Sequence, residues 1–221
     1  MKNKRWPLLR SNYDINGTGR AAMFCLSFFM WGLAFRSQAQ QYSFRVVIPS
    51  SSVIIAGSTT INEFECELIA YSANNPVMVK SIFQKDQILF KGLELAYPVD
   101  GFDCGVPLMN HDFQHFLTST DHPYILLELK KIIINREHSQ MEKVSVESEV
   151  TISLSGRKRD HVIRNGFVIN QSDTQMVLTG YDNIRFSDFQ LTPPSRFFGT
   201  VTVSDDLTIR FEIEMRVQKI P

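Results

Sequence analysis

The segment "LTIRFEIEMRV", residues 207–217, constrains the fold more than any other part of the sequence. Apolar side chains occupy every second position in it, and threonine or charged side chains occupy the positions between them. Successive side chains of a β-strand point to opposite faces, whereas a helix would need apolar residues three or four positions apart. The segment therefore predicts an antiparallel strand with one face in the core and the other in water.

A similar but less strict alternation continues through the chain from residue 42 onward. Turn-forming residues at 74–76, 164–166 and 204–206 divide it, and "GSTT" at 57–60 predicts a turn from which another strand begins. The expected strands cover residues 64–71, 93–99, 124–132, 146–155, 166–170, 175–181 and 199–203.

One segment, "PLMNHDFQHFLTSTDHP" at residues 107–123, breaks this period of two. Its apolar residues have helical spacing: Met109, Phe113, Phe116 and Leu117. Asn110 is the expected N-cap, and the proline that closes the segment is expected to end the helix. Eight or more strands, one short helix and no internal repeat predict an all-β, antiparallel barrel or sandwich.

The first 39 residues differ from the rest. A basic stretch precedes the apolar run "AAMFCLSFFMWGLAF", and small residues at Ser37 and Ala39 precede Gln40. This order is typical of a secretory signal peptide, so we expect cleavage before Gln40 and a periplasmic or secreted domain at residues 40–221. An uncleaved membrane anchor is the rival interpretation, but the run is about fifteen residues long and a membrane span usually needs about twenty.

Cleavage would change the charge and the cysteine count. Residues 1–39 hold six of the 23 basic and one of the 23 acidic residues, which leaves 17 basic and 22 acidic residues and a net charge of −5. Proteins that bind nucleic acid need a basic surface, so we expect no nucleic-acid partner. Cys25 would leave with the peptide, and Cys66 and Cys104 would remain as an even pair. A disulfide is expected between them in an exported protein, and two buried thiols are the alternative.

No catalytic signature is evident. The sequence contains no phosphate-binding loop, nucleophile elbow or cysteine-histidine metal spacing. His111 and His115 in "HDFQH" stand one helical turn apart, as in zinc peptidases, but no third ligand is evident, and histidines on an exposed helix face are the simpler interpretation. The basic run "GRKRDH" at 156–161 predicts a solvated hairpin tip, with contact to anionic headgroups as the alternative. We therefore expect no enzyme, metal or cofactor.

Phenylalanine is frequent after residue 40, often on the expected inner phase of a strand or on the helix. Each ring on its own is more typical of a core residue than of a ligand contact. Together they predict an apolar interior, and a barrel of about eight strands can either fill with side chains or hold one ligand. The residues are Phe64, Phe83, Phe90, Phe113, Phe116, Phe167, Phe186, Phe189, Phe198 and Phe211.

Three stretches resemble one protein family in order and spacing: "GSTTINEFECEL", "CGVPLMNHDFQHFLTSTDHPYILLEL" and "LTGYDNIRFSDFQLTPPSRFFGTVTVSDDLTIRFEIEM". The family is that of the YceI-like polyisoprenoid-binding proteins, and the form most similar is the secreted one of Bacteroidetes-type bacteria. The resemblance covers residues 43–217. "GRKRDHVI" departs from it, because family members usually carry a small apolar residue and threonine there.

The resemblance implies an extended, lipocalin-like antiparallel barrel of about eight strands whose tunnel holds a long isoprenoid chain. We then expect binding, carriage or storage of an isoprenoid or fatty-acyl lipid without chemical change, with transient contact to a membrane. A solidly packed barrel that serves as a structural or protein-interaction module is the rival function. The expected tunnel lining is Phe64, Phe113, Leu117, Ile125, Leu127, Phe167, Phe189, Phe198 and Phe211. Phe186 and Phe189 can both face the interior only if the backbone bends or bulges between them, and Phe189 is the one assigned to it.

Overall fold

The computed structural model describes residues 40–138, 143–172, 174–196 and 200–220. The expected signal peptide and the expected lining residue Phe198 lie outside these ranges.

The described chain consists of strands, one α-helix and three short 3₁₀ helices. In chain order the elements are β1 (Gln40–Thr59), β2 (Glu63–Gln84), β3 (Gln87–Lys91), β4 (Glu94–Pro98), η1 (Val99–Gly101), α1 (Pro107–Phe116), β5 (Tyr124–Asn135), η2 (Arg136–His138), β6 (Lys143–Leu154), β7 (Arg157–Ser172), β8 (Gln175–Arg185), η3 (Phe186–Phe189), β9 (Ser195–Arg196) and β10 (Val201–Ile220).

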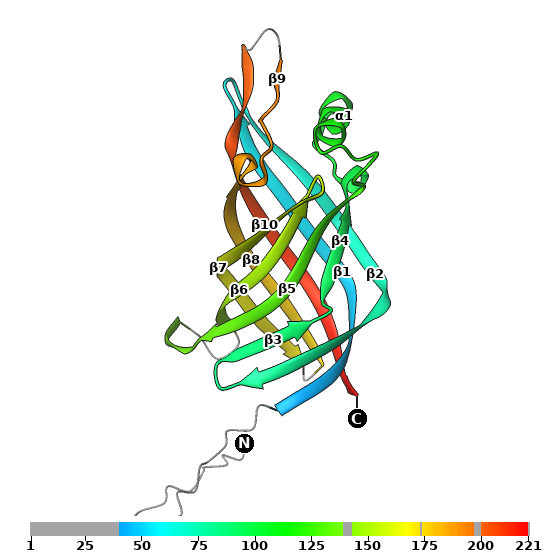
Figure 1. Cartoon of the computed structure of the whole chain (residues 1–221), viewed down its shortest axis with the longest axis vertical. Coiled ribbons are helices and arrows are strands. Elements are labelled where there is room, and N and C mark those ends of the chain that lie inside the picture. The colour runs from blue at the N-terminus through cyan, green and yellow to red at the C-terminus, as the bar shows by residue number, and fades with distance from the viewer. Residues whose placement is uncertain (1–39, 139–142, 173, 197–199, 221) are drawn as a thin grey trace, which may run out of the picture. The chain divides into compact units, whose positions relative to one another are not determined.

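The sheet closes on itself because β1 pairs with both β2 and β10. The order around the ring is β1, β2, β3, β5, β6, β7, β8 and β10, while β4 pairs with β5 and β9 pairs with β10. All of these pairings are antiparallel. The expected all-β, lipocalin-like barrel with one short helix is confirmed. Figure 1 shows α1 and β9 at one end of the barrel and β3 at the other.

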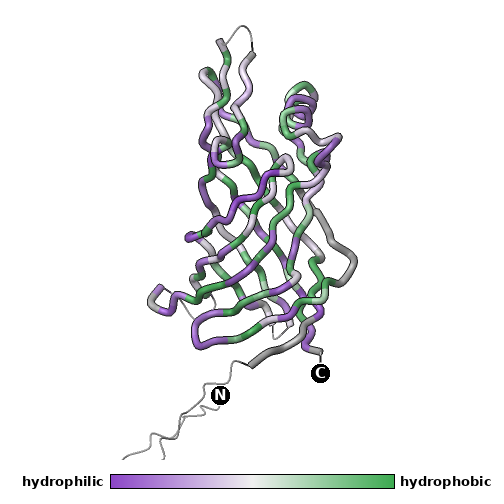
Figure 2. The backbone as a smooth tube through the Cα atoms, in the orientation of Figure 1, coloured by the Kyte–Doolittle hydropathy of each residue, from purple (hydrophilic) through white to green (hydrophobic). Residues whose placement is uncertain are grey.

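Alternation along the strands gives the barrel its apolar interior. Figure 2 shows hydrophobic and hydrophilic positions interchanging along the wall. On β10 the odd-numbered residues from Leu207 to Met215 face inward, as the period of two predicts, and the most deeply buried of these are Leu207, Ile213 and Met215. The buried residues of β1, β2, β6 and β10 join in one hydrophobic cluster.

The helix begins earlier than the sequence suggested. Val106 precedes α1 and Pro107 is its first residue, so the expected N-cap role of Asn110 is wrong, and the helix ends at Phe116. Proline suits the first helical position because its missing N–H would have no partner there. The Asn110 side chain instead accepts a hydrogen bond from the backbone N–H of Cys104 (2.6 Å) and donates to Asp103 (3.1 Å). It therefore holds the loop that leads into α1.

The four turns that were expected at residues 57–60, 74–76, 164–166 and 204–206 do not lie where the sequence predicted them. Gly57 lies inside β1, and the turn occupies the residues after Thr59. The motifs at 74–76, 164–166 and 204–206 lie inside β2, β7 and β10, where the register with a neighbouring strand shifts. Such residues open β-bulges as readily as turns, because a bulge also needs a locally irregular backbone. Long strands with bulges therefore replace pairs of shorter strands.

The structure contains the expected disulfide between Cys66 on β2 and Cys104. Both cysteines are buried, with 1% and 7% of their surface exposed. Two backbone hydrogen bonds between Glu67 and Asp103, 2.8 and 2.9 Å long, lie beside the disulfide. The crosslink therefore fastens the segment before α1 to the barrel wall.

Replacing both cysteines, Cys66→Ala with Cys104→Ala, should lower the free energy of unfolding. The disulfide joins residues 38 positions apart. A loop of that length gives about 4 kcal/mol by the chain-entropy model. Denaturant unfolding of the oxidised protein and the double variant measures the difference. Equal midpoints for the two proteins would show that no crosslink forms.

Candidate functional site

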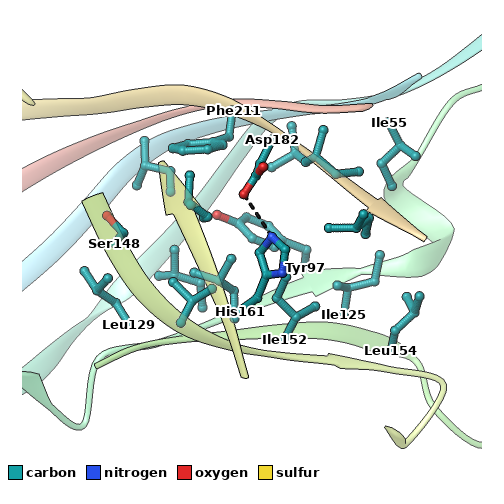
Figure 3. Close-up of a pocket in the computed structure, with 18 of the residues that line it drawn as sticks. Ile55, Tyr97, Ile125, Leu129, Ser148, Ile152, Leu154, His161, Asp182 and Phe211 are labelled. Carbon is teal, nitrogen blue, oxygen red and sulfur yellow. Dashed lines mark hydrogen bonds and ion pairs between the residues drawn. The ribbon is translucent and has the colours of Figure 1, made fainter. Parts of the chain in front are cut away.

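An apolar cavity of about 110 Å³ lies inside the barrel. Strands β1, β5, β6, β7, β8 and β10 of the ring contribute aliphatic side chains to it, including Val53 and Ile55 on β1, Val150 on β6 and Ile163 on β7, whereas the described side chains of β2 and β3 contribute none. Figure 3 shows apolar side chains such as Ile55, Leu129 and Phe211 around this space. The interior of the barrel is therefore not completely filled by side chains where these residues meet.

Aromatic rings gather at the α1 end of the cavity. Phe113 of α1 packs against Phe102 with the ring centroids 5.5 Å apart, and Phe116 meets Phe186 edge to face at 4.9 Å. Phe102, Phe113 and Phe186 line the cavity. No residue of α1 itself is fully buried, although Leu117, directly after it, is. The helix therefore covers this end of the barrel through few contacts.

A short 3₁₀ helix, η3, positions the rings that follow β8. Its N-terminal region is held by Asp205 on β10, which accepts hydrogen bonds from the backbone N–H (2.8 Å) and the hydroxyl of Ser187. The Ser187 hydroxyl is the main reason that the pKa of Asp205 lies below its ordinary value. Protonation of Asp205 at low pH would weaken these bonds, so this anchoring is present at neutral pH and is lost in acid.

Phe186 and Phe189, the first and last residues of η3, are both buried but have different neighbours. Phe186 lines the cavity. Phe189, with 2% of its surface exposed, belongs to a second cluster with Val99, Leu117 and Leu154. The bend or bulge that was expected between them is a 3₁₀ turn, which carries the two side chains into adjoining regions, so Phe186 lines the cavity and the expected Phe189 lies beside it.

The other expected lining residues divide into two groups. The cavity is lined by Phe113, Leu117, Ile125, Leu127 and Phe211. Phe64 and Phe167 are not in the lining. The Phe64 ring lies over Gly57, where an added Cβ would be 2.6 Å from it. Whether any of these residues binds a ligand remains a prediction.

Phe167 faces away from the cavity because of a bulge in β7. Ser148 pairs with Ile163, but Val146 pairs with Gly166, so β7 has one more residue than β6 between these pairs. A single extra residue moves the inward phase from odd to even positions. The Phe167 ring consequently lies under the ammonium group of Lys143, 3.9 Å from the ring centroid.

Polar side chains are few in the lining. They are Ser148, Tyr97, His161 and Asp182. The Tyr97 hydroxyl bonds the buried hydroxyl of Ser51 at 3.1 Å. Nε2 of His161 lies 2.9 Å from Oδ2 of Asp182, as Figure 3 shows. This pair was not predicted from the sequence, although both residues lie on the inward phase of their strands.

The basic run at 156–161 forms a hairpin tip, as expected, and two of its arginines also contact the η3 region. Ser155 and Gly156, both with positive φ, make a two-residue turn between β6 and β7, as type I′ hairpins do. Arg157 donates to the side chain of Gln190 and Arg159 to the backbone carbonyl of Asp188. These arginines therefore hold the η3 region against β7.

The metal hypothesis gains no support from the described residues. His111 and His115 lie on the exposed side of α1 with their rings stacked 6.4 Å apart. No group of histidine, cysteine or acidic residues in the described ranges is arranged to hold a metal ion. Within the same ranges, every helix is too short or too polar to cross a membrane.

The barrel has the fold of a domain whose structure has been solved. A polyisoprenoid-binding domain from Saccharophagus degradans, implicated in plant cell wall breakdown, matches with a TM-score of 0.53 at 10% sequence identity, over 80% of this chain and 99% of that one. The chain has the fold of that domain. The structural comparison therefore agrees, at the level of the fold, with the resemblance seen in the sequence.

Two further matches are looser. BcnA of Burkholderia cenocepacia gives a TM-score of 0.49 at 14% identity, over 74% of this chain and 95% of that one. A YceI protein of Campylobacter jejuni gives 0.42 at 18% identity, over 60% of this chain and 74% of that one. Neither a protein-family model nor a curated protein matches the sequence.

The placement of the phenylalanines can be tested by stability. Phe189→Ala removes a fully buried ring and should cost about 3–5 kcal/mol of unfolding free energy. Phe167→Ala removes an outward ring and should cost about 1 kcal/mol or less. Denaturant unfolding of the two variants measures both values. The reverse order would mean that the register of β7 or the conformation of η3 is different.

Proposed function

We propose that this chain is a YceI-like protein that binds an apolar lipid, an isoprenoid or fatty-acyl chain, inside its barrel without transforming it. The apolar cavity enclosed by the ring of strands carries this proposal. A filled barrel would need no such space, since protein interiors are normally packed to the density of organic crystals. Burial of a lipid chain supplies affinity at about 25 cal/mol per Å² of apolar surface removed from water. Binding therefore requires no acid, base or nucleophile.

The cavity must widen to admit a whole chain. At about 110 Å³ it is smaller than the apolar cavity of about 150 Å³ that binds a molecule of the size of benzene. The α1 end is where it can widen, because α1 has no fully buried residue. Segments with few buried contacts open at low free-energy cost. We therefore infer that α1 and the rings of Phe113 and Phe116 move aside when a lipid enters.

We further propose that the protein is exported and meets its lipid at a membrane. The Cys66–Cys104 disulfide supports this proposal, because disulfides persist in oxidising compartments, and cleavage before Gln40 would be part of the export. Large apolar side chains stay exposed beside α1: Val106 is 55% exposed and Leu108 is 70% exposed. At the same end of the barrel in Figure 1, Ile61 in the turn between β1 and β2 is 71% exposed. Such a rim suits brief contact with acyl chains.

Filling the cavity tests the binding. Ile152 is half-buried and lines the cavity from β6, whereas Ile133 is half-buried on the outer phase of β5. Ile152→Phe should reduce the uptake of cis-parinaric acid, whose fluorescence rises in an apolar site, and Ile133→Phe should leave uptake unchanged. Circular dichroism and thermal melting confirm that both variants are folded. No uptake by the unmodified protein would instead favour the solid interaction module.

Exposed apolar residues near α1 should govern the rate of loading. The double variant Val106→Ser with Leu108→Ser is expected to slow the transfer of parinaric acid from anionic vesicles to the protein. The equilibrium affinity of the protein for parinaric acid should not change. Met78→Ser is the control, since Met78 is 56% exposed on β2 in the part that pairs with β1 opposite Arg45. Stopped-flow fluorescence measures the rates. Equal rates for the double variant and the control would contradict a membrane-facing role for this end.

A further inference from the structure

We propose that His161 and Asp182 form a hydrogen-bonding site for a hydroxyl group carried by the lipid within the cavity. This inference rests on the proposed function and specifies its ligand. An apolar chain that bears an alcohol would then be bound in preference to the same chain without a hydrogen-bond donor.

Both oxygens of the Asp182 carboxylate take part in hydrogen bonds within the protein. Oδ2 lies 2.9 Å from Nε2 of His161, and Oδ1 accepts a hydrogen bond of 2.8 Å from the backbone N–H of Asn183. Both side chains are largely covered, with 28% and 20% of their surface exposed. A carboxylate held in this way orients the imidazole, as carboxylates do for ligating histidines.

This orientation determines what His161 offers to the cavity. A carboxylate only accepts hydrogen bonds, so Nε2 carries the hydrogen that is donated to Asp182. In the neutral imidazole, the other nitrogen, Nδ1, then has a free lone pair and is an acceptor. No residue in the described ranges hydrogen-bonds Nδ1, while the ring itself lines the cavity. The wall therefore presents one acceptor to whatever occupies the interior.

The surroundings make a purely structural role a poor explanation. His161 on β7 pairs with Val150 on β6, and Asp182 on β8 pairs with Ile209 on β10. Val150 and Ile209 are apolar residues of the lining. Replacing such a pair by packed apolar side chains is often neutral or stabilising. A pure hydrocarbon in the cavity would displace water from Nδ1 and leave it without a partner, at a cost in affinity. A hydroxyl group supplies the missing donor.

The test compares farnesol with its methyl ether, in which a methyl group replaces the hydroxyl hydrogen. The ether keeps the chain and the oxygen but cannot donate. The unmodified protein should bind farnesol about three- to tenfold more tightly, the range expected for one neutral hydrogen bond. Binding is measured by competition with parinaric acid at mildly alkaline pH. His161→Phe should bind both probes with equal affinity.

Asp182→Asn provides a second, nearly isosteric variant. Its Oδ1 would still accept from the backbone of Asn183, so its Nδ2 would face His161. The imidazole would then have to carry its hydrogen on Nδ1, which becomes a donor. Both probes have an oxygen that can accept from it, so the preference for the alcohol should disappear although the histidine remains. Ser148→Ala, elsewhere in the lining, is the control and should keep the preference.

The outcomes separate the two proposals. Equal binding of both probes by the unmodified protein, or an alcohol preference that survives in His161→Phe, overturns the hydroxyl site while the lipid-binding function stands. A preference lost in Ser148→Ala but kept in the other variants also overturns it. If the unmodified protein binds neither probe and takes up no parinaric acid, the lipid-binding function itself fails.

Discussion

Pairing of β1 with β10 is the constraint on which the rest of the structure depends. It closes the sheet into a ring of eight strands and turns one face of the wall toward a common interior. The alternation of apolar and polar residues then determines which side chains enter that interior. The enclosed volume is slightly larger than those side chains fill, and the apolar cavity is the consequence.

Period-two alternation was enough to predict an all-β, antiparallel barrel or sandwich, and the family resemblance favoured the barrel. Helical spacing was enough to locate α1. The sequence pattern could not predict where the phase changes. At Arg164–Gly166 the polar and glycine residues open a bulge instead of a turn, and Phe167 leaves the interior as a result. Bulges and turns use the same residue types, so only the pairing partner, which is distant in sequence, decides between them.

The apolar residues of the candidate site could be predicted from the sequence in part, and its polar residues could not. Ile125, Leu127 and Phe211 were expected in the lining because they lie on regular strands. His161 was assigned to a hairpin tip, since the basic residues around it suggested solvent. Its position becomes clear only from the register, which places it opposite Val150 and on the inner wall. Polar residues on an inward phase are the local signal that could have identified it.

The small size of the cavity means that the proposed lipid can enter only if part of the protein moves. The interior holds space for a few carbon atoms, and the remainder must come from movement of the thinly attached α1. A lipid would therefore be enclosed when it binds, and its release would require the same end to open. The pair of His161 and Asp182 would add a choice among lipids to an interior that otherwise selects only for apolarity.

Native mass spectrometry of the purified protein, followed by lipid extraction, tests the central claim most directly. We expect the protein to carry a bound mass that dissociates on activation and is recovered in the extract as an isoprenoid or fatty-acyl lipid. A protein that has only the mass of its chain, gives an extract without lipid and stays empty after incubation with lipid vesicles would contradict the claim.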